Sequence, residues 1–145
     1  MLDADTFVTA LDHAGYRLTE PRRRVADMVA AKKGNFTAAE LEEEARRRHL
    51  GVGRATIFRA LELFVELGLV ERLDLPTGDH VYVACQPSHH HHILCIACGK
   101  STDIEDCGVS AVAREVGRRT GYAIQSHRLQ LFAICPDCQQ KAAAG

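Results

Sequence analysis

The sequence of 145 residues lacks any apolar run that approaches the roughly 18 residues of a membrane span. It also lacks a strong charge of either sign, because its net charge is −1 at pH 7. Overall charge therefore gives no support for a nucleic-acid partner, and any DNA-binding face must be a local basic patch. The first residues carry Asp3, Asp5 and Asp12 and no apolar segment. We therefore expect no signal peptide, no membrane partner and a cytoplasmic location.

Cysteine is absent from the first 84 residues, and all six cysteines follow them. Four consecutive histidines at 89–92 run into a Cys-x-x-Cys-Gly motif, and a second Cys-x-x-Cys pair lies near the end. Two such pairs can close a tetrahedral thiolate site, which is the geometry and ligand type that zinc prefers. The predicted structural zinc ligands are Cys95, Cys98, Cys135 and Cys138.

The spacing of the two cysteine pairs indicates what lies between them. The 36 residues from Cys98 to Cys135 exceed the usual zinc-ribbon gap of roughly 15–20. A small domain would therefore lie between the pairs and be tied at its base by the metal. Disulfide bonds and a thioredoxin-like redox motif are the alternatives. A cytosolic chain with two separated pairs favours metal over both.

The first 84 residues have the pattern of helices followed by a hairpin. Apolar spacing, capping residues and glycine stops predict helices over 4–14, 20–32, 37–49 and 54–67. Two segments of strand character, 69–73 and 80–84, flank a Pro-Thr-Gly-Asp turn. Three helices followed by a two-stranded hairpin form a winged helix-turn-helix, in which the last helix reads DNA and the hairpin is the wing.

The helix over 54–67 carries an unusual outward face. Its apolar arc places Phe58 and Arg59 outside the core stripe, together with Arg54. An aromatic side chain beside an arginine suits a helix in the DNA major groove, where it can contact a thymine methyl while arginine reaches guanine. The alternative is that Phe58 packs against a neighbouring domain.

The residues after 84 predict a small α+β unit. Strands are expected at 93–94 and 102–104, a helix over 109–119 with Val112 and Val116 inward, and a strand region over 122–134. The predicted fold class is α+β, with a winged helix-turn-helix domain at 1–84 and a dimerisation and metal-binding domain at 85–145.

With these motifs in order, the chain resembles the ferric uptake regulator (Fur) family. The matching segments are Gly-Tyr-Arg-Leu-Thr-Glu-Pro-Arg at 15–22, Ala-Thr-Ile-Phe-Arg-Ala-Leu at 55–61, Gly-Leu-Val at 68–70, the histidine run with its Cys-Ile-Ala-Cys-Gly at 89–99, and the closing Cys-Pro-Asp-Cys. The resemblance implies a dimeric, metal-dependent repressor that binds double-stranded operator DNA. The residues assigned to DNA are Arg17, Arg54, Thr56, Phe58 and Arg59. The family commonly has Tyr at the position of Phe58.

The resemblance also implies a regulatory metal site between the domains. In the zinc-sensing branch of the family (Zur), a cysteine before the histidine run joins two alternating histidines and an acidic residue of the wing. Carried over by position, these ligands are Glu71, Cys85, His90 and His92. A thiolate, two imidazoles and a carboxylate form a four-coordinate set that suits Zn²⁺. The alternative for Cys85 is a buried thiol at a strand end.

Iron, manganese and peroxide sensors of the family are the alternative for the metal. Their additional ligands would fall at Asn35 and Val83, neither of which can serve. Asp103 does match an acidic ligand of those sensors, which keeps the alternative open.

A further family site lies on the other face of the histidine run. Here it matches His89, His91 and His127, while the expected acidic ligand falls at Ser110 and Glu105 is the substitute. Cys107 matches no site in the family. It is either an inert small residue near the start of a helix or an accessible thiol.

These patterns together predict a zinc-responsive repressor of metal-uptake genes, with structural and regulatory Zn²⁺ and no small-molecule substrate. One zinc between the domains would set the spacing of the two recognition helices in a dimer. A metal-dependent enzyme is the rival class, but the sequence has no His-Glu-x-x-His motif. A zinc-storage module would not need the outward Phe58-Arg59 pair. We therefore predict that the protein is not an enzyme.

Overall fold

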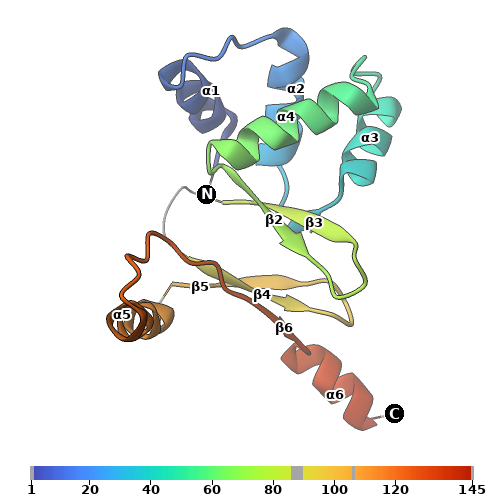
Figure 1. The fold of residues 1–145 in the computed structure, drawn as a ribbon. Coiled ribbons are helices and arrows are strands. Elements are labelled where there is room, and N and C mark those ends of the chain that lie inside the picture. Colours follow the sequence, from blue (N-terminus) through green and yellow to red (C-terminus); the bar gives the residue numbers. More distant parts are fainter. Residues whose placement is uncertain (1, 86–89, 106, 145) are drawn as a thin grey trace. The chain divides into compact units, whose positions relative to one another are not determined.

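The computed structural model describes residues 2–85, 90–105 and 107–144 (Figure 1). The chain divides into two compact units, Met1–Ser88 and His89–Gly145, and each is described by itself. Within the described ranges, no helix has the length and apolar character needed to cross a membrane. Over the described residues the architecture is mixed α+β, as predicted, with four helices and a small sheet in the first unit and two helices and a second sheet in the other.

Four helices open the first unit, close to their predicted bounds. They are α1 (Ala4–His13), α2 (Glu20–Ala30), α3 (Ala38–Arg47) and α4 (Arg54–Glu66). Local side-chain caps explain where two of these helices, α2 and α3, begin. The Thr19 side chain accepts from the Arg22 N–H at 3.3 Å. Thr37 and Glu40 form the reciprocal capping box of α3, with distances of 2.7 and 3.1 Å.

The core of the first unit joins all four helices. Phe7 of α1 meets Phe64 of α4 edge-to-face, with ring centroids 4.9 Å apart. Ile57, Leu61 and Phe64 form the fully buried stripe of α4. This stripe fixes which side of α4 remains outside the core, and that outer side carries the arginines of the helix.

The wing is a sheet of three strands, one more than the predicted hairpin. The strands β2 (Val70–Asp74) and β3 (His80–Ala84) pair antiparallel, and β1 (Asn35–Phe36) adds to the free edge of β3 in the order β1-β3-β2. The sequence predicted no strand at 35–36. Phe36 holds the extra strand in place, because it is 2% exposed and stacks on Tyr82 at 6.0 Å.

The second unit is built on a mixed sheet. Its strands are β4 (His91–Cys95), β5 (Ser101–Ile104) and β6 (Gln130–Ala133), in the order β5-β4-β6. β4 is antiparallel to β5 and parallel to β6. The helix α5 (Val109–Thr120) lies between β5 and β6 in the chain, and α6 (Pro136–Ala144) follows β6 as the last element.

Two expectations for the second unit were wrong, and one helix was not predicted. The strand region predicted over 122–134 is a strand only at 130–133. The helix α6 was not predicted, although Pro136 at its first position and the alanines after it favour a helix. Val112 and Val116 were expected to face inward, but they are 61% and 44% exposed, and α5 has no buried residue. The amphipathic pattern of α5 was real, but no other part of the described unit covers its apolar side.

Candidate metal centres and nucleic-acid interface

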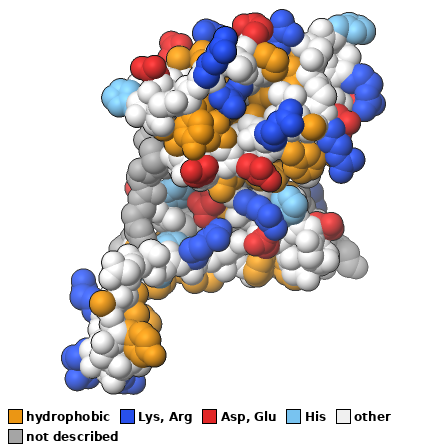
Figure 2. Space-filling view, turned by 45° about the horizontal axis from the view of Figure 1, so that its top comes forward, with side chains coloured by type: hydrophobic (Ala, Val, Ile, Leu, Met, Phe, Trp, Pro, Cys, Tyr) orange, Lys and Arg blue, Asp and Glu red, His pale blue; other side chains and the backbone are white. Residues whose placement is uncertain are grey.

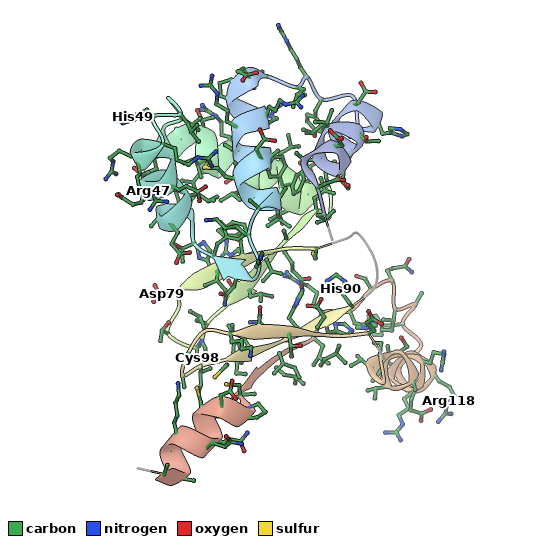
Figure 3. The ribbon with its side chains drawn as sticks, turned by 180° about the vertical axis from the view of Figure 1, so that it is seen from behind. Arg47, His49, Asp79, His90, Cys98 and Arg118 are labelled. Carbon is green, nitrogen blue, oxygen red and sulfur yellow. The ribbon has the colours of Figure 1, made fainter. Side chains whose placement is uncertain are left out.

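The four predicted structural ligands converge in the second unit. Cys95 ends β4, Cys98 lies in the turn that follows (Figure 3), and Cys135 and Cys138 stand at the start of α6. Their four sulfur atoms lie within 4.8 Å of one another. The Cys98 and Cys135 sulfurs are 3.8 Å apart. Four sulfurs at about 2.3 Å from a central zinc would be roughly 3.8 Å apart in a tetrahedron. The cluster therefore fits a zinc site.

Backbone geometry supports thiolates at this cluster. The Cys135 N–H donates to the Cys95 sulfur at 3.3 Å, and the backbone N–H groups of Cys135 and Cys98 lower the pKa of Cys95 to about 6. The neighbouring Cys135 and Cys98 side chains instead raise the pKa of Cys138 to about 12. Four sulfurs in contact cannot all be negative without a cation, and a bound cation would remove that restriction.

Two of the predicted regulatory residues share one face of the wing. Glu71 of β2 lies directly across from Val83 of β3. Cys85 lies two residues after Val83, and its N–H donates to the Leu69 carbonyl at 3.0 Å, which continues the ladder. Cross-strand partners and residues two apart point to the same side of a sheet. Glu71 and Cys85 are therefore on the same face, and both are half-buried.

The same row explains the two missing ligands of the iron-type sensors. Asn35 of β1 pairs with Val83, which pairs with Glu71, so all three side chains lie across one face. A histidine and a carboxylate at 35 and 83 would stand beside Glu71. In this chain those positions hold an amide and an apolar side chain. Glu71 and Cys85 are thus the two side chains of this row whose atoms could bind a metal.

The predicted histidine ligands lie at the start of β4. His90 (Figure 3) and His92 are two residues apart, and their rings meet edge-to-face at 4.8 Å. His92 is fully buried, and its Nδ1 lies 2.8 Å from the Asp103 carboxylate, directly across the β4–β5 ladder. An acidic side chain therefore stands directly beside the buried His92 ring.

The opposite face of β4 carries His91, which meets His127 with 3.3 Å between their Nε2 atoms. Cys107 joins them at 3.0 Å from His91 and 3.1 Å from His127. Glu105 is exposed after β5 and is not part of this group, and the predicted partner His89 lies outside the described residues. Sequence reasoning missed Cys107. Its place three residues before Ser110, where an acidic ligand was expected, was the available signal.

The predicted DNA-contacting residues lie mainly at the start of α4. Arg54 and Arg59 are exposed, and Thr56 and Phe58 are half-buried. The Arg54 guanidinium lies 5.4 Å over the Phe58 ring, a cation–π arrangement that orients both side chains. Phe58 also packs against the helical core, so one edge of its ring is held by the unit itself.

Charge on the first unit is mixed rather than basic. Arg17 is exposed in the segment before α2, and its carbonyl accepts from the Arg22 guanidinium. Figure 2 shows Lys and Arg side chains interspersed with Asp and Glu over the visible face. With a net charge of −1, binding to DNA would depend on a few well-placed side chains rather than on a broad positive field.

Comparison with known proteins decides the family. The Ferric uptake regulator family model matches residues 13–132. The chain belongs to the ferric uptake regulator family. It is a metal-responsive, DNA-binding transcription regulator and not an enzyme.

Relatives within the ferric uptake regulator family are named after different metals, zinc in one case and iron in another. The zinc uptake regulation protein of Mycobacterium tuberculosis is 36% identical over 126 residues, which cover 87% of this chain and 97% of the relative. The ferric uptake regulation protein of Escherichia coli K12 is 31% identical over 136 residues, covering 91% of each. Membership of the family therefore leaves the choice of metal to the donor atoms of this chain.

Solved structures share the fold. A zinc uptake regulator complexed with zinc and DNA matches with a TM-score of 0.75 at 22% identity, over 97% of this chain and 95% of that one. The Helicobacter pylori ferric uptake regulator, described as having three functional metal-binding sites, matches with a TM-score of 0.71 at 19% identity, over 93% and 90%. Because these two structures are only 22% and 19% identical to this chain, their similarity establishes the fold alone.

Proposed function

We propose that the protein is a zinc-responsive repressor of metal-uptake genes. The observation that carries this proposal is the donor set of the wing. Glu71 and Cys85 lie on one face of the wing together with Asn35 and Val83. This face therefore offers a metal one carboxylate and one thiolate. A thiolate favours zinc over iron(II) or manganese(II), which are better served by nitrogen and oxygen donors.

His90 and His92 would complete this regulatory site. With Glu71 and Cys85 they supply one oxygen, one sulfur and two nitrogens, which is a four-coordinate set for zinc. The contact of 2.8 Å between the Asp103 carboxylate and the His92 ring places a negative charge beside the proposed ligand, which favours a bound cation there. An iron- or manganese-responsive regulator remains the second candidate, and it would require Asp103 itself as a ligand.

The regulatory zinc would act by joining the two units of the chain. Glu71 and Cys85 belong to the first unit, and His90 and His92 belong to the second. A metal bound by all four restricts the arrangement of the units. In a dimer, that restriction sets the distance between the two α4 helices, which must match half-sites about one helical turn apart or a multiple of it. Zinc and operator DNA must then each increase the affinity for the other.

The second unit supports dimerisation through an uncovered apolar surface. Large apolar side chains on and after α5 and along β6 are 40–75% exposed in the single chain. They are Val112, Val116, Tyr122, Ile124, Leu131, Phe132 and Ile134. Large apolar side chains exposed in this number mark an interaction site, and a second copy of this chain would cover them with the same residues. The cluster of four cysteines would hold a permanent structural zinc beside β6.

Replacement of Arg59 by alanine tests the DNA-reading role. Because Arg59 is exposed on the outer face of α4, its loss should weaken specific operator binding by about 1–3 kcal/mol if it contacts a base. Fluorescence anisotropy with operator DNA in the presence of zinc measures the loss.

Arg118→Ala is the matched control, because Arg118 points outward from α5 (Figure 3) and pairs with Glu115 at 2.6 Å. This variant should bind as the unaltered protein does. Equal operator affinity of Arg59→Ala and the unaltered protein would exclude α4 as the reading helix.

A further inference from the structure

Three metal-binding atoms meet within the second unit, on the face of β4 opposite His92. His91 comes from β4, Cys107 from the segment before α5, and His127 from the segment between α5 and β6. The two imidazole Nε2 atoms are 3.3 Å apart. The Cys107 sulfur lies 3.0 and 3.1 Å from them. His91 is 4% exposed, and the other two are half-buried. Three separate segments therefore converge on one small, shielded triangle.

Hydrogen bonding accounts for at most two sides of this triangle at a time. A neutral imidazole nitrogen carries either a proton or a lone pair, so it cannot donate and accept together, and a thiol has one proton to give. The third contact then either shares a proton that already serves another side or brings two like groups together. A single cation at the centre satisfies all three atoms at once, because each presents a lone pair to it.

The distances are close to those of a zinc site. With zinc at about 2.0–2.1 Å from nitrogen and 2.3 Å from sulfur, tetrahedral ligands are roughly 3.3 Å apart for two nitrogens and 3.6 Å for sulfur and nitrogen. The two Nε2 atoms are already at 3.3 Å. The two sulfur contacts, at 3.0 and 3.1 Å, are short by about half an ångström, which a small rotation of the Cys107 side chain supplies.

We propose that Cys107 is a thiolate ligand for zinc at this further site, together with His91 and His127. The site lies wholly within the second unit and does not depend on the regulatory set of the proposed function. Resemblance to the family placed an acidic ligand at Ser110. Here Cys107 supplies the negative charge from the same turn, since the Ser110 N–H donates to its carbonyl at 3.4 Å. The thiolate moves the preference of the site toward zinc and away from manganese.

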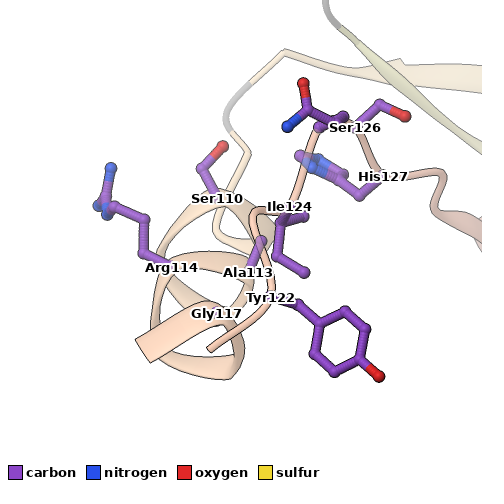
Figure 4. Close-up of a pocket in the computed structure, with 9 residues that line it drawn as sticks. Ser110, Ala113, Arg114, Gly117, Tyr122, Ile124, Ser126 and His127 are labelled. Carbon is purple, nitrogen blue, oxygen red and sulfur yellow. The ribbon is translucent and has the colours of Figure 1, made fainter. Parts of the chain in front are cut away.

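One ligand of this site, His127, lines a pocket. A hollow of about 420 Å³ is lined by Ser110, Arg114 and His127 among others (Figure 4). The Ser110 hydroxyl lies 3.7 Å from the Cys107 sulfur. Three protein ligands with one open position leave room for a water molecule as the fourth ligand.

Cobalt(II) is the probe, because a cobalt ion bound by a thiolate absorbs in the near ultraviolet through charge transfer from sulfur. The experiment uses the Cys85→Ala chain with zinc retained in the four-cysteine cluster, as checked by native mass spectrometry. In that background Cys107 is the remaining thiolate outside the cluster. Cobalt titration should produce the sulfur band. In Cys85→Ala/Cys107→Ser the band should vanish, and the cobalt affinity of the site should fall at least tenfold.

Two further variants make the outcome decisive. Ser110→Ala removes a neighbour of Cys107 without removing a proposed ligand, so the sulfur band should persist. Glu105→Gln should also retain it. Circular dichroism of Cys107→Ser checks that the variant folds. Absence of the band in Cys85→Ala, or its persistence in Cys85→Ala/Cys107→Ser, would overturn the proposal. Loss of cobalt binding in Glu105→Gln without any sulfur band would identify a carboxylate site instead.

Discussion

Cys85→Ala is expected to give a folded dimer that has lost its response to zinc. The change removes the soft ligand and one negative charge from the proposed regulatory set and leaves Glu71, His90 and His92. Loss of even an outer partner of a metal ligand costs about 10–100-fold in affinity. We therefore expect the zinc concentration for half-maximal operator binding to rise by about 100-fold or more. Anisotropy titrations with buffered zinc measure it, and metal analysis should find one fewer tightly held zinc per chain.

Cys85→Asp is the informative companion of this variant. It restores an anionic ligand without sulfur, so it should recover metal-dependent DNA binding with a preference shifted toward iron(II) and manganese(II). The zinc response of the unaltered protein should also weaken as pH falls, because a ligating thiol must lose its proton. A wild-type zinc response in Cys85→Ala would mean that Cys85 is only a packed thiol. The iron or manganese alternative with Asp103 would then be the better account.

Cys138→Ser is expected to have the largest effect on the fold itself. Among its described residues, the second unit buries only His91, His92, Leu94 and Cys95, and neither of its helices has a buried residue. So small a core cannot offset the conformational entropy of ordering the unit. Structural zinc contributes about 10–16 kcal/mol of apparent binding free energy in small zinc-finger peptides, and this energy becomes folding energy. Loss of one ligand should therefore yield a misfolded or monomeric protein.

Light scattering, zinc analysis and circular dichroism together test this expectation. Cys107→Ser is the control, since it removes a thiol of the same unit that lies outside the four-cysteine cluster. It should remain a folded dimer that retains the structural zinc. A Cys138→Ser protein that stays dimeric and zinc-loaded, with an unchanged melting temperature, would show that the four-thiolate assignment is wrong.

The helices of the first unit were predictable because their signals are local. Thr19, Thr37 and Glu40 satisfy the first N–H groups of their helices within three residues along the chain. β1 was missed because its signal is not local. Asn35 pairs with Val83, and a two-residue strand has no periodicity of its own. In the structure, pairing with β3 and the stacking of Phe36 on Tyr82 identify it.

The second unit shows two further limits of sequence reasoning. The spacing of Val112 and Val116 predicted an apolar face for α5 but could not show that the chain itself leaves it uncovered, as their exposures of 61% and 44% do. Cys107 could not be assigned because its partners come from 16 residues before it and 20 residues after it. The paired Cys-x-x-Cys motifs, by contrast, carry their ligand spacing in the sequence, and their four sulfurs converge.

The central claim is that zinc, bound through Cys85, switches this regulator to its DNA-binding form. The most direct measurement is a titration of operator binding with Zn²⁺, Fe²⁺ and Mn²⁺ in turn, under anaerobic conditions. The protein should be stripped of regulatory metal while it keeps its structural zinc. We expect Zn²⁺ to restore binding at far lower free concentration than either other ion. Restoration by Fe²⁺ or Mn²⁺ at equal or lower free concentration than Zn²⁺ would contradict the account.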